Sequence, residues 1–135
     1  MTQTIVATSR PAYQAYQLLY LAFIVAPLVA GLDKFTHFLT AWDKYVAPVV
    51  ADILPVSVDT FMLLVGLVEI AAAVLVALRP RIGAYVVAAW LAGIVINLLL
   101  IPAYFDIALR DFGLMLGALA LARLSKDFGE GAAAR

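Results

Sequence analysis

The chain has 135 residues, of which 66% are hydrophobic and 13% charged, and its formal net charge is zero. At this length we expect one domain, residues 1–135. Since soluble domains are roughly 45–50% apolar, the composition predicts that this domain is almost wholly embedded in a membrane. The zero net charge gives no reason to expect nucleic acid as a partner. With no cysteine and one histidine, the chain alone offers no disulfide, thiol redox centre, Cys-ligated zinc or iron–sulfur cluster, so we expect no intrinsic cofactor and no metal site.

The first apolar run predicts a membrane helix over residues 12–32. A secretory signal peptide is the alternative, because Leu-Val-Ala before Gly31 faintly resembles a cleavage site. That triplet is not A-x-A and the residues before the apolar run are weakly basic, which favours a retained helix. Pro27 is expected to bend this helix or to leave one carbonyl without a partner, as a helix bundle tolerates.

The next segment, residues 33–58, is too polar to cross a membrane. Over about 35–47 its apolar residues recur at helical spacing, which predicts an amphipathic helix in the first extracytoplasmic loop. The members of this pattern are Phe35, Phe38, Leu39, Trp42, Tyr45, Val46 and Val49. Such a helix is expected to lie in the membrane interface or to fold over the bundle as a cap, and Pro48 and Pro55 end or break it.

The second membrane helix is predicted over residues 59–78, which is about 30 Å of helix, the thickness of a bilayer core. It carries Glu69 near the midplane, with small residues on the same face, Gly66, Ala73 and Ala77. A carboxyl at that depth costs at least about 2.5 kcal/mol on insertion scales, so it is expected to face other helices. Three roles stay open for it: a protonated carboxyl hydrogen-bonded to the first or last helix, a proton relay, or a group that orients a polar ligand head.

Two further membrane helices are predicted, over residues 82–101 and 108–124, and the short turn at residues 78–81 makes the second and third helices an antiparallel hairpin. The fold class is therefore all-α, an integral membrane bundle of four transmembrane helices. One end of this bundle carries six cations, Arg10, Arg79, Arg81, Arg123, Lys126 and Arg135, and the other carries three, Lys34, Lys44 and Arg110. The positive-inside rule then places both termini in the cytoplasm, with the protein in the inner membrane.

Polar side chains gather toward the opposite, outer end, above Glu69. The candidate ligand or proton-relay residues are Glu69, Asn97, His37, Arg110 and Tyr104, and the candidate ion-pair residues are Arg110, Asp33, Asp106 and Asp111. Each has a simpler role: Asn97 can join two helices, His37 can face solvent or headgroups, and Tyr104 can anchor the interface, as can Trp42. Arg110 at a helix N-terminus needs a partner, either an aspartate, with Asp33 or Asp106 preferred, or a ligand carbonyl or phosphate. No catalytic residue can be named.

Four short motifs resemble those of the DoxX-like family of small bacterial membrane proteins. They are Gly31-Leu32-Asp33-Lys34-Phe35 after the first helix, Val68-Glu69-Ile70 in the second, the basic turn Leu78-Arg79-Pro80-Arg81-Ile82-Gly83, and Leu109-Arg110-Asp111-Phe112-Gly113 at the start of the last. The resemblance covers most of residues 12–124 and implies a four-helix membrane protein, linked to membrane redox systems through a subunit of a thiosulfate:quinone oxidoreductase. It supplies no catalytic residues.

The function expected from this resemblance is that of a small subunit of a bacterial respiratory or redox membrane complex. Such a subunit anchors a partner or shapes a quinone site without a redox centre of its own. We therefore expect a non-catalytic subunit of an oxidoreductase complex in preference to an enzyme. Its partners are then membrane lipids and other membrane subunits or further copies, and a quinone or lipid is the expected bound molecule. Two alternatives stay open: a structural accessory subunit that only packs and binds lipid, and a small oligomeric transporter or channel that uses Glu69.

Overall fold

The computed structural model describes residues 2–129, with side chains from residue 10 onward, and this part of the chain is helical and contains no strand. The elements are α1 (Thr2–Thr36), the 3-10 turn η1 (Trp42–Tyr45), α2 (Pro48–Ile53), α3 (Val58–Leu78), α4 (Pro80–Leu100) and α5 (Phe105–Phe128). The predicted all-α class is confirmed. The predicted positions of the long helices agree with these bounds, although α1 and α5 extend beyond the predicted residues at both ends.

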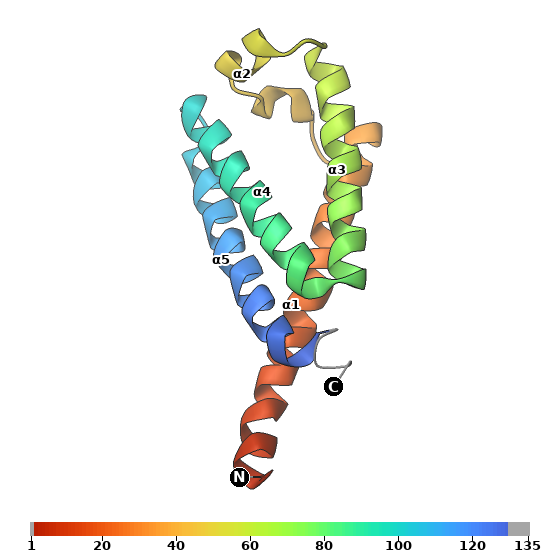
Figure 1. Cartoon of the computed structure of the whole chain (residues 1–135). Helices are drawn as coiled ribbons and strands as arrows, with labels where there is room; N and C mark the ends of the chain where they lie inside the picture. Colours follow the sequence, from red (N-terminus) through yellow and green to blue (C-terminus); the bar gives the residue numbers. More distant parts are fainter. Residues whose placement is uncertain (1, 130–135) are drawn as a thin grey trace.

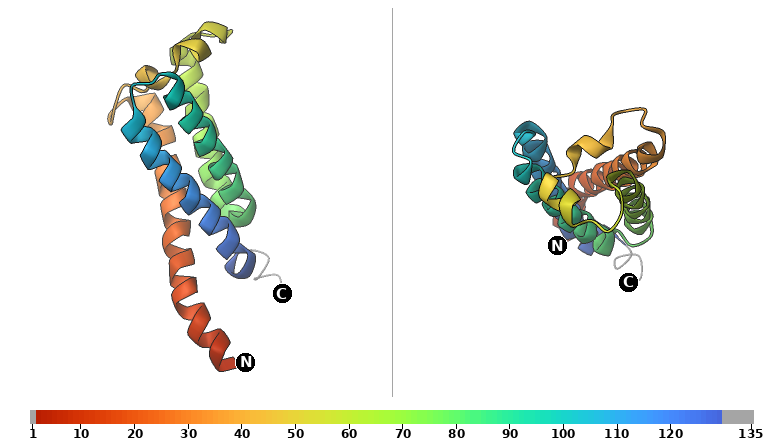
Figure 2. Two further views of the ribbon diagram at one scale, coloured as in Figure 1. Left: turned by 90° about the vertical axis from the view of Figure 1, so that its left-hand side faces the viewer. Right: turned by 90° about the horizontal axis from the view of Figure 1, so that it is seen from above.

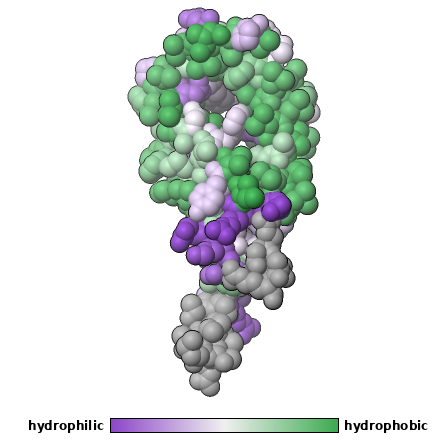
Figure 3. All heavy atoms as spheres, viewed as in Figure 1, coloured by the Kyte–Doolittle hydropathy of each residue, from purple (hydrophilic) through white to green (hydrophobic). Residues whose placement is uncertain are grey.

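Three of these helices are long and apolar enough to cross a membrane, over Arg10–Thr36, Val58–Leu78 and Pro80–Leu100. This pattern of long apolar helices is typical of a membrane protein. Apolar side chains also cover most of the visible surface between the two ends of the bundle (Figure 3). In this view the largest group of hydrophilic side chains lies near the end where the N-terminal part of α1 projects from the bundle, and smaller groups lie toward the opposite end (Figures 1 and 3).

The four long helices form two antiparallel pairs, α1 with α3 and α4 with α5. The pairs lie closest where Arg79 joins α3 to α4, which we call the turn end (Figure 1). They diverge toward the other end, where residues 37–57 run from α1 to α3 (Figure 2). We call this second end the loop end.

Local sequence explains the bounds of α3 and α4. The Ser57 hydroxyl oxygen accepts a hydrogen bond from the Thr60 amide at 3.2 Å, which caps the first turn of α3. The helix stops before Pro80, because a residue that precedes proline avoids helical backbone angles. Pro80 is then the first residue of α4, where its fixed backbone angle fits and no amide donor is lost.

The apolar core lies toward the turn end and is built largely from small side chains. Its buried members are Tyr16, Phe23, Ala72, Val76, Ala84, Val87, Ala88, Ala118, Leu121 and Ala122. Gly83 brings α4 against α3 so closely that a Cβ there would stand 2.5 Å from the Val76 amide nitrogen. Tyr20 adds a polar contact across the bundle, since its hydroxyl donates to the Ala77 carbonyl at 2.6 Å.

The predicted amphipathic helix over about 35–47 is wrong. Helix α1 ends at Thr36, and between residues 37 and 47 only the short turn η1 is helical. Asp33 is the physical reason. Its carboxylate accepts the amides of Phe38 and Leu39 at 2.9 and 3.0 Å, so these two amides bond a side chain instead of continuing the helix. His37 adopts the left-handed backbone conformation, with φ of 55°, and its amide donates to the Asp33 carbonyl at 2.6 Å, which closes α1.

Candidate functional site: a buried charged cluster

The backbones of α1 and α3 approach each other closely at two glycines. A Cβ added to Gly31 would stand 2.7 Å from the Gly66 carbonyl oxygen, and one added to Gly66 would stand 2.8 Å from the Gly31 carbonyl oxygen. No larger residue fits either position without moving a backbone. Glycine at this crossing therefore sets the distance across which side chains of the two helices meet.

Lys34 of α1 and Glu69 of α3 form an ion pair beside this crossing. Each lies three residues after one of the two glycines. Side chains on a helix lean toward its N-terminus, so in two antiparallel helices these side chains lean toward each other. The residues are 4% and 8% exposed, so both charges are withdrawn from solvent and lipid. The expected burial of Glu69 is confirmed, and its partner is a cation of α1.

Lys34 has further contacts that hold its ammonium group in place. Its Nζ lies 3.7 Å from the centre of the Trp42 ring and 3.5 Å from the Ala30 carbonyl oxygen. The Trp42 indole N–H donates to the Asp33 carboxylate at 2.8 Å, which fixes the ring over the lysine. A desolvated cation over a tryptophan face contributes about 2 kcal/mol to stability. Trp42, expected to anchor the membrane interface, is therefore also a component of this site.

The third helix at the site is α5, which supplies Asp111 and Arg110. Asp111 is 5% exposed and lies near enough to Glu69 to act on it electrostatically. The Arg110 Nε donates to the Asp111 carboxylate at 3.0 Å, while the rest of the arginine side chain is 65% exposed. We call Lys34, Glu69, Arg110 and Asp111 the charged cluster. Its two cations and two carboxylates balance formally and come from α1, α3 and α5.

The expected partner of Arg110 was Asp33 or Asp106, and the structure pairs it with Asp111 instead. Asp33 is committed to the backbone and to Trp42 at the end of α1. Asp106 lies in the first turn of α5, one turn before Arg110. The neighbouring Asp111 reaches the guanidinium locally and is itself buried, so this pairing also neutralises a carboxylate inside the bundle.

Asn97 does not join two helices, as its expected role required. Its side-chain oxygen accepts the Ala47 amide at 2.9 Å, and its side-chain nitrogen donates to the Tyr45 carbonyl. The Asn97 side chain of α4 thus holds residues 45–47, which lead from η1 to α2, against the loop end of the bundle. Tyr104 packs edge-on against Tyr45, with ring centres 4.9 Å apart, and so supports the same segment.

Among the predicted site residues, the structure unites Glu69, Arg110 and Asp111 and leaves the others apart. His37 is exposed at the end of α1, and Asn97 and Tyr104 hold the connecting segment. The residue that the sequence analysis missed as a partner of Glu69 is Lys34. The signal was present as two matching spacings, Gly31-x-x-Lys34 in one helix and Gly66-x-x-Glu69 in the next.

The charged cluster holds α1 to α3 through the Lys34–Glu69 pair, and because its charges are already paired within the chain, it is poorly suited to bind a ligand. Each of its charged side chains faces another within the same chain, and Arg110 alone extends outward. In the part of the chain from residue 10 to 129, no three His, Cys, Asp or Glu side chains are grouped so that they could hold a metal ion. Loss of one member of a buried ion pair costs about 3–5 kcal/mol, so the Lys34–Glu69 pair strongly constrains how α1 and α3 pack.

Comparisons of the chain with protein-family models, with curated proteins and with solved structures give no match. The function therefore has to be inferred from the residues themselves and from their geometry.

Proposed function

We propose that this chain crosses the bacterial inner membrane four times, with both termini in the cytoplasm and residues 37–57 outside. The fourth span is α5, which is less apolar than the others because its uncharged stretch, residues 112–122, covers only about 17 Å of helix. Two features support the assignment. Helix α5 packs along α4, and Asp111, just before that stretch, is shielded inside the bundle.

Cysteine labelling tests this topology without interference, because the chain has no native cysteine. The exposed residues Asp52 and Lys126 mark the loop end and the turn end. With a membrane-impermeant thiol reagent on intact cells, Asp52→Cys is expected to react at once and Lys126→Cys only after lysis. The reverse order would invert the topology, and reaction of both from outside would remove α5 as a span.

The function that the geometry supports best is that of a membrane scaffold subunit, similar to DoxX-like proteins, in a respiratory or redox complex. It anchors a partner or shapes a quinone site and has no redox centre of its own. The observation that carries this proposal is the Lys34–Glu69 ion pair, buried at 4% and 8% exposure and engaged within one chain. A fixed, internally neutralised cluster suits a rigid support for a partner.

The other two functions have less support. A transporter assembled around Glu69 needs that carboxylate on a surface shared between copies, whereas Glu69 faces Lys34 inside a single chain. A structural accessory subunit has the same internal geometry as a scaffold and differs from it in what it binds. Partner identity therefore separates these two possibilities.

Purification of the tagged chain from its native membrane in mild detergent is the test. A scaffold is expected to co-purify with a subunit that carries a redox cofactor, seen by absorption spectroscopy and mass spectrometry. Glu69→Gln is expected to weaken this association, and Asp59→Asn, at an exposed carboxylate in the first turn of the same helix, is the matched control. Recovery of the chain with lipid alone would favour the structural accessory subunit and refute the redox scaffold.

A further inference from the structure

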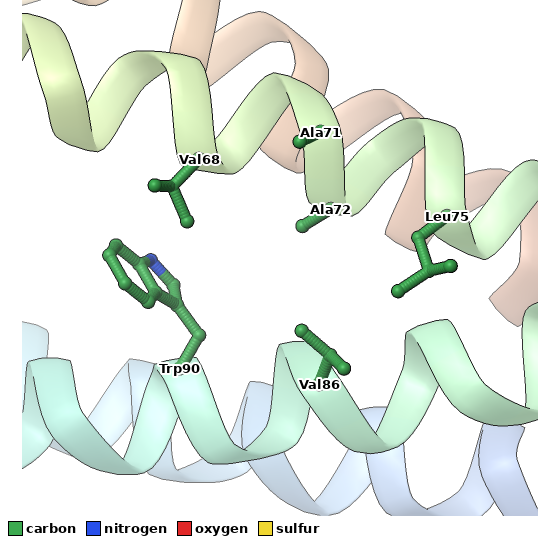
Figure 4. Close-up of a pocket in the computed structure, with 6 residues that line it drawn as sticks. All are labelled: Val68, Ala71, Ala72, Leu75, Val86 and Trp90. Carbon is green, nitrogen blue, oxygen red and sulfur yellow. The ribbon is translucent and has the colours of Figure 1, made fainter.

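The bundle has an apolar recess of about 170 Å³ between α3 and α4. Its lining residues are Val68, Ala71, Ala72 and Leu75 from α3, and Val86 and Trp90 from α4 (Figure 4). A surface without charges or exposed hydrogen-bond donors has no group that selects one polar molecule over another. Cations at the turn end of the bundle, outside this recess, do supply such groups.

Three cations lie where α4 begins and α5 ends. They are Arg81, in the first turn of α4, and Arg123 and Lys126, in the last two turns of α5. All three are exposed, and within residues 10–129 none of them forms an ion pair. Asp127, beside Lys126, is also exposed, so three positive charges and one negative charge leave a net charge of +2. This surface attracts anions.

Helix geometry places the three cations on one outer face of the α4–α5 pair. Arg123 and Lys126 each follow a buried residue of α5, and Arg81 follows the buried Pro80 of α4. One step along a helix is a rotation of about 100°, which in two antiparallel helices turns toward the same side of the pair. The two helix ends are also level, because Pro80 Cγ lies 3.2 Å from where a Cβ on Gly129 would stand.

Tyr85 extends this face toward the membrane core. It lies one turn after Arg81 and follows the buried Ala84, so its side chain, 43% exposed, shares the outer face with the arginine. Tyr85 is five residues from Pro80, the first residue of α4, which is about 7.5 Å of helix. A tyrosine at this depth has its ring among acyl chains and its hydroxyl at the level of the headgroups.

We propose that the outer face formed by Arg81, Tyr85, Arg123 and Lys126 binds the phosphodiester headgroup of an anionic phospholipid. The guanidinium groups donate to phosphate oxygens as planar forks, and the lysine adds a point charge. A zwitterionic lipid carries its own cation, which the net positive charge of this face repels. The inference rests on the membrane placement proposed above, in which the turn end faces the anionic cytoplasmic leaflet.

The experiment measures lipid binding to the purified chain, released from micelles of a neutral detergent, by native mass spectrometry. The probes are phosphatidylglycerol, which is anionic, and phosphatidylcholine with the same acyl chains. Phosphatidylglycerol is expected to bind more tightly, and Arg81→Gln and Lys126→Gln are each expected to weaken its binding about fivefold with little effect on phosphatidylcholine. Lys44→Gln, at an exposed cation of the loop end, is the matched control and is expected to change neither.

Equal binding of the two lipids, or an equal loss with Lys44→Gln, would overturn the proposal. So would displacement of phosphatidylglycerol by inorganic phosphate, because the site would then select a free anion. Loss of selectivity in Ala71→Leu, which fills the apolar recess, would place the lipid there instead. Micelles have no inner and outer side and the assay needs no protein partner, so this site can fail while the proposed topology and scaffold function stand.

Discussion

The Lys34–Glu69 pair predicts a large energetic coupling between two residues that lie 35 positions apart. The perturbation is a double-mutant cycle of Lys34→Met, Glu69→Leu and the double variant, all of similar side-chain volume. Because the residues are only 4% and 8% exposed, each single change leaves a charge buried without its partner and is expected to cost about 3–5 kcal/mol. The loss of stability for Glu69→Leu is expected to be nearer 3 kcal/mol, because Lys34 keeps its contact with the Trp42 ring.

The double variant is expected to unfold within about 1 kcal/mol of the parent chain, because a well-packed apolar pair replaces a buried ion pair at little cost. The coupling energy is then at least about 5 kcal/mol. The assay is reversible unfolding of the purified protein in mixed micelles as the mole fraction of sodium dodecyl sulfate rises, followed by circular dichroism. Asp59→Asn, at an exposed carboxylate of the same helix, is the control and is expected to change stability by less than about 0.5 kcal/mol. Single changes that add to within about 0.5 kcal/mol would refute the pairing.

Three further changes have expected outcomes in the same assay. Gly31→Ala places a methyl group 2.7 Å from the Gly66 carbonyl oxygen and is expected to lower stability by about 2–3 kcal/mol. The control Gly93→Ala adds a methyl group with no atom within 4 Å and is expected to be neutral or stabilising. Equal effects of the two changes would contradict the close crossing of α1 and α3. Asn97→Leu leaves one backbone amide and one carbonyl of the connecting segment without partners, so we expect a loss of about 2 kcal/mol and faster proteolysis there, and unchanged proteolysis would argue against its fastening role. Arg110→Ala is expected to cost about 1 kcal/mol or less because the side chain is 65% exposed, and a loss above about 3 kcal/mol would show that it is a buried member of the cluster.

Much of the helical architecture can be predicted from the sequence because hydropathy and helix length are properties of contiguous residues. The burial of Glu69 follows in the same way, from a carboxyl in the middle of an apolar helix with small residues beside it. The identity of its partner does not follow, because Lys34 lies near the end of an apolar run, where a lysine ordinarily reaches water. Only the crossing of two backbones at Gly31 and Gly66 brings the lysine inward.

The connecting segment shows where periodicity misleads. Its apolar residues repeat at helical spacing, yet periodicity describes side chains and does not account for the backbone amides. Asp33 lies just before the periodic stretch and competes for those amides, so the helix ends at Thr36. The pairing of Arg110 with its neighbour Asp111 was equally hidden, since several aspartates were available and burial, which selects among them, is a property of the folded chain.

The unequal spacing of the two helix pairs has a mechanical consequence. Because Gly83 packs tightly against Val76, the two helix pairs are held together at the turn end, and a rotation of one pair relative to the other has its pivot there. A helix of 21 residues is about 30 Å long, so a rotation of about 5° at the pivot moves its far end by about 2.6 Å. Small changes in packing near Arg79 are thereby magnified at the loop end, where the hydrogen bonds from Asn97 of α4 to Tyr45 and Ala47 resist them.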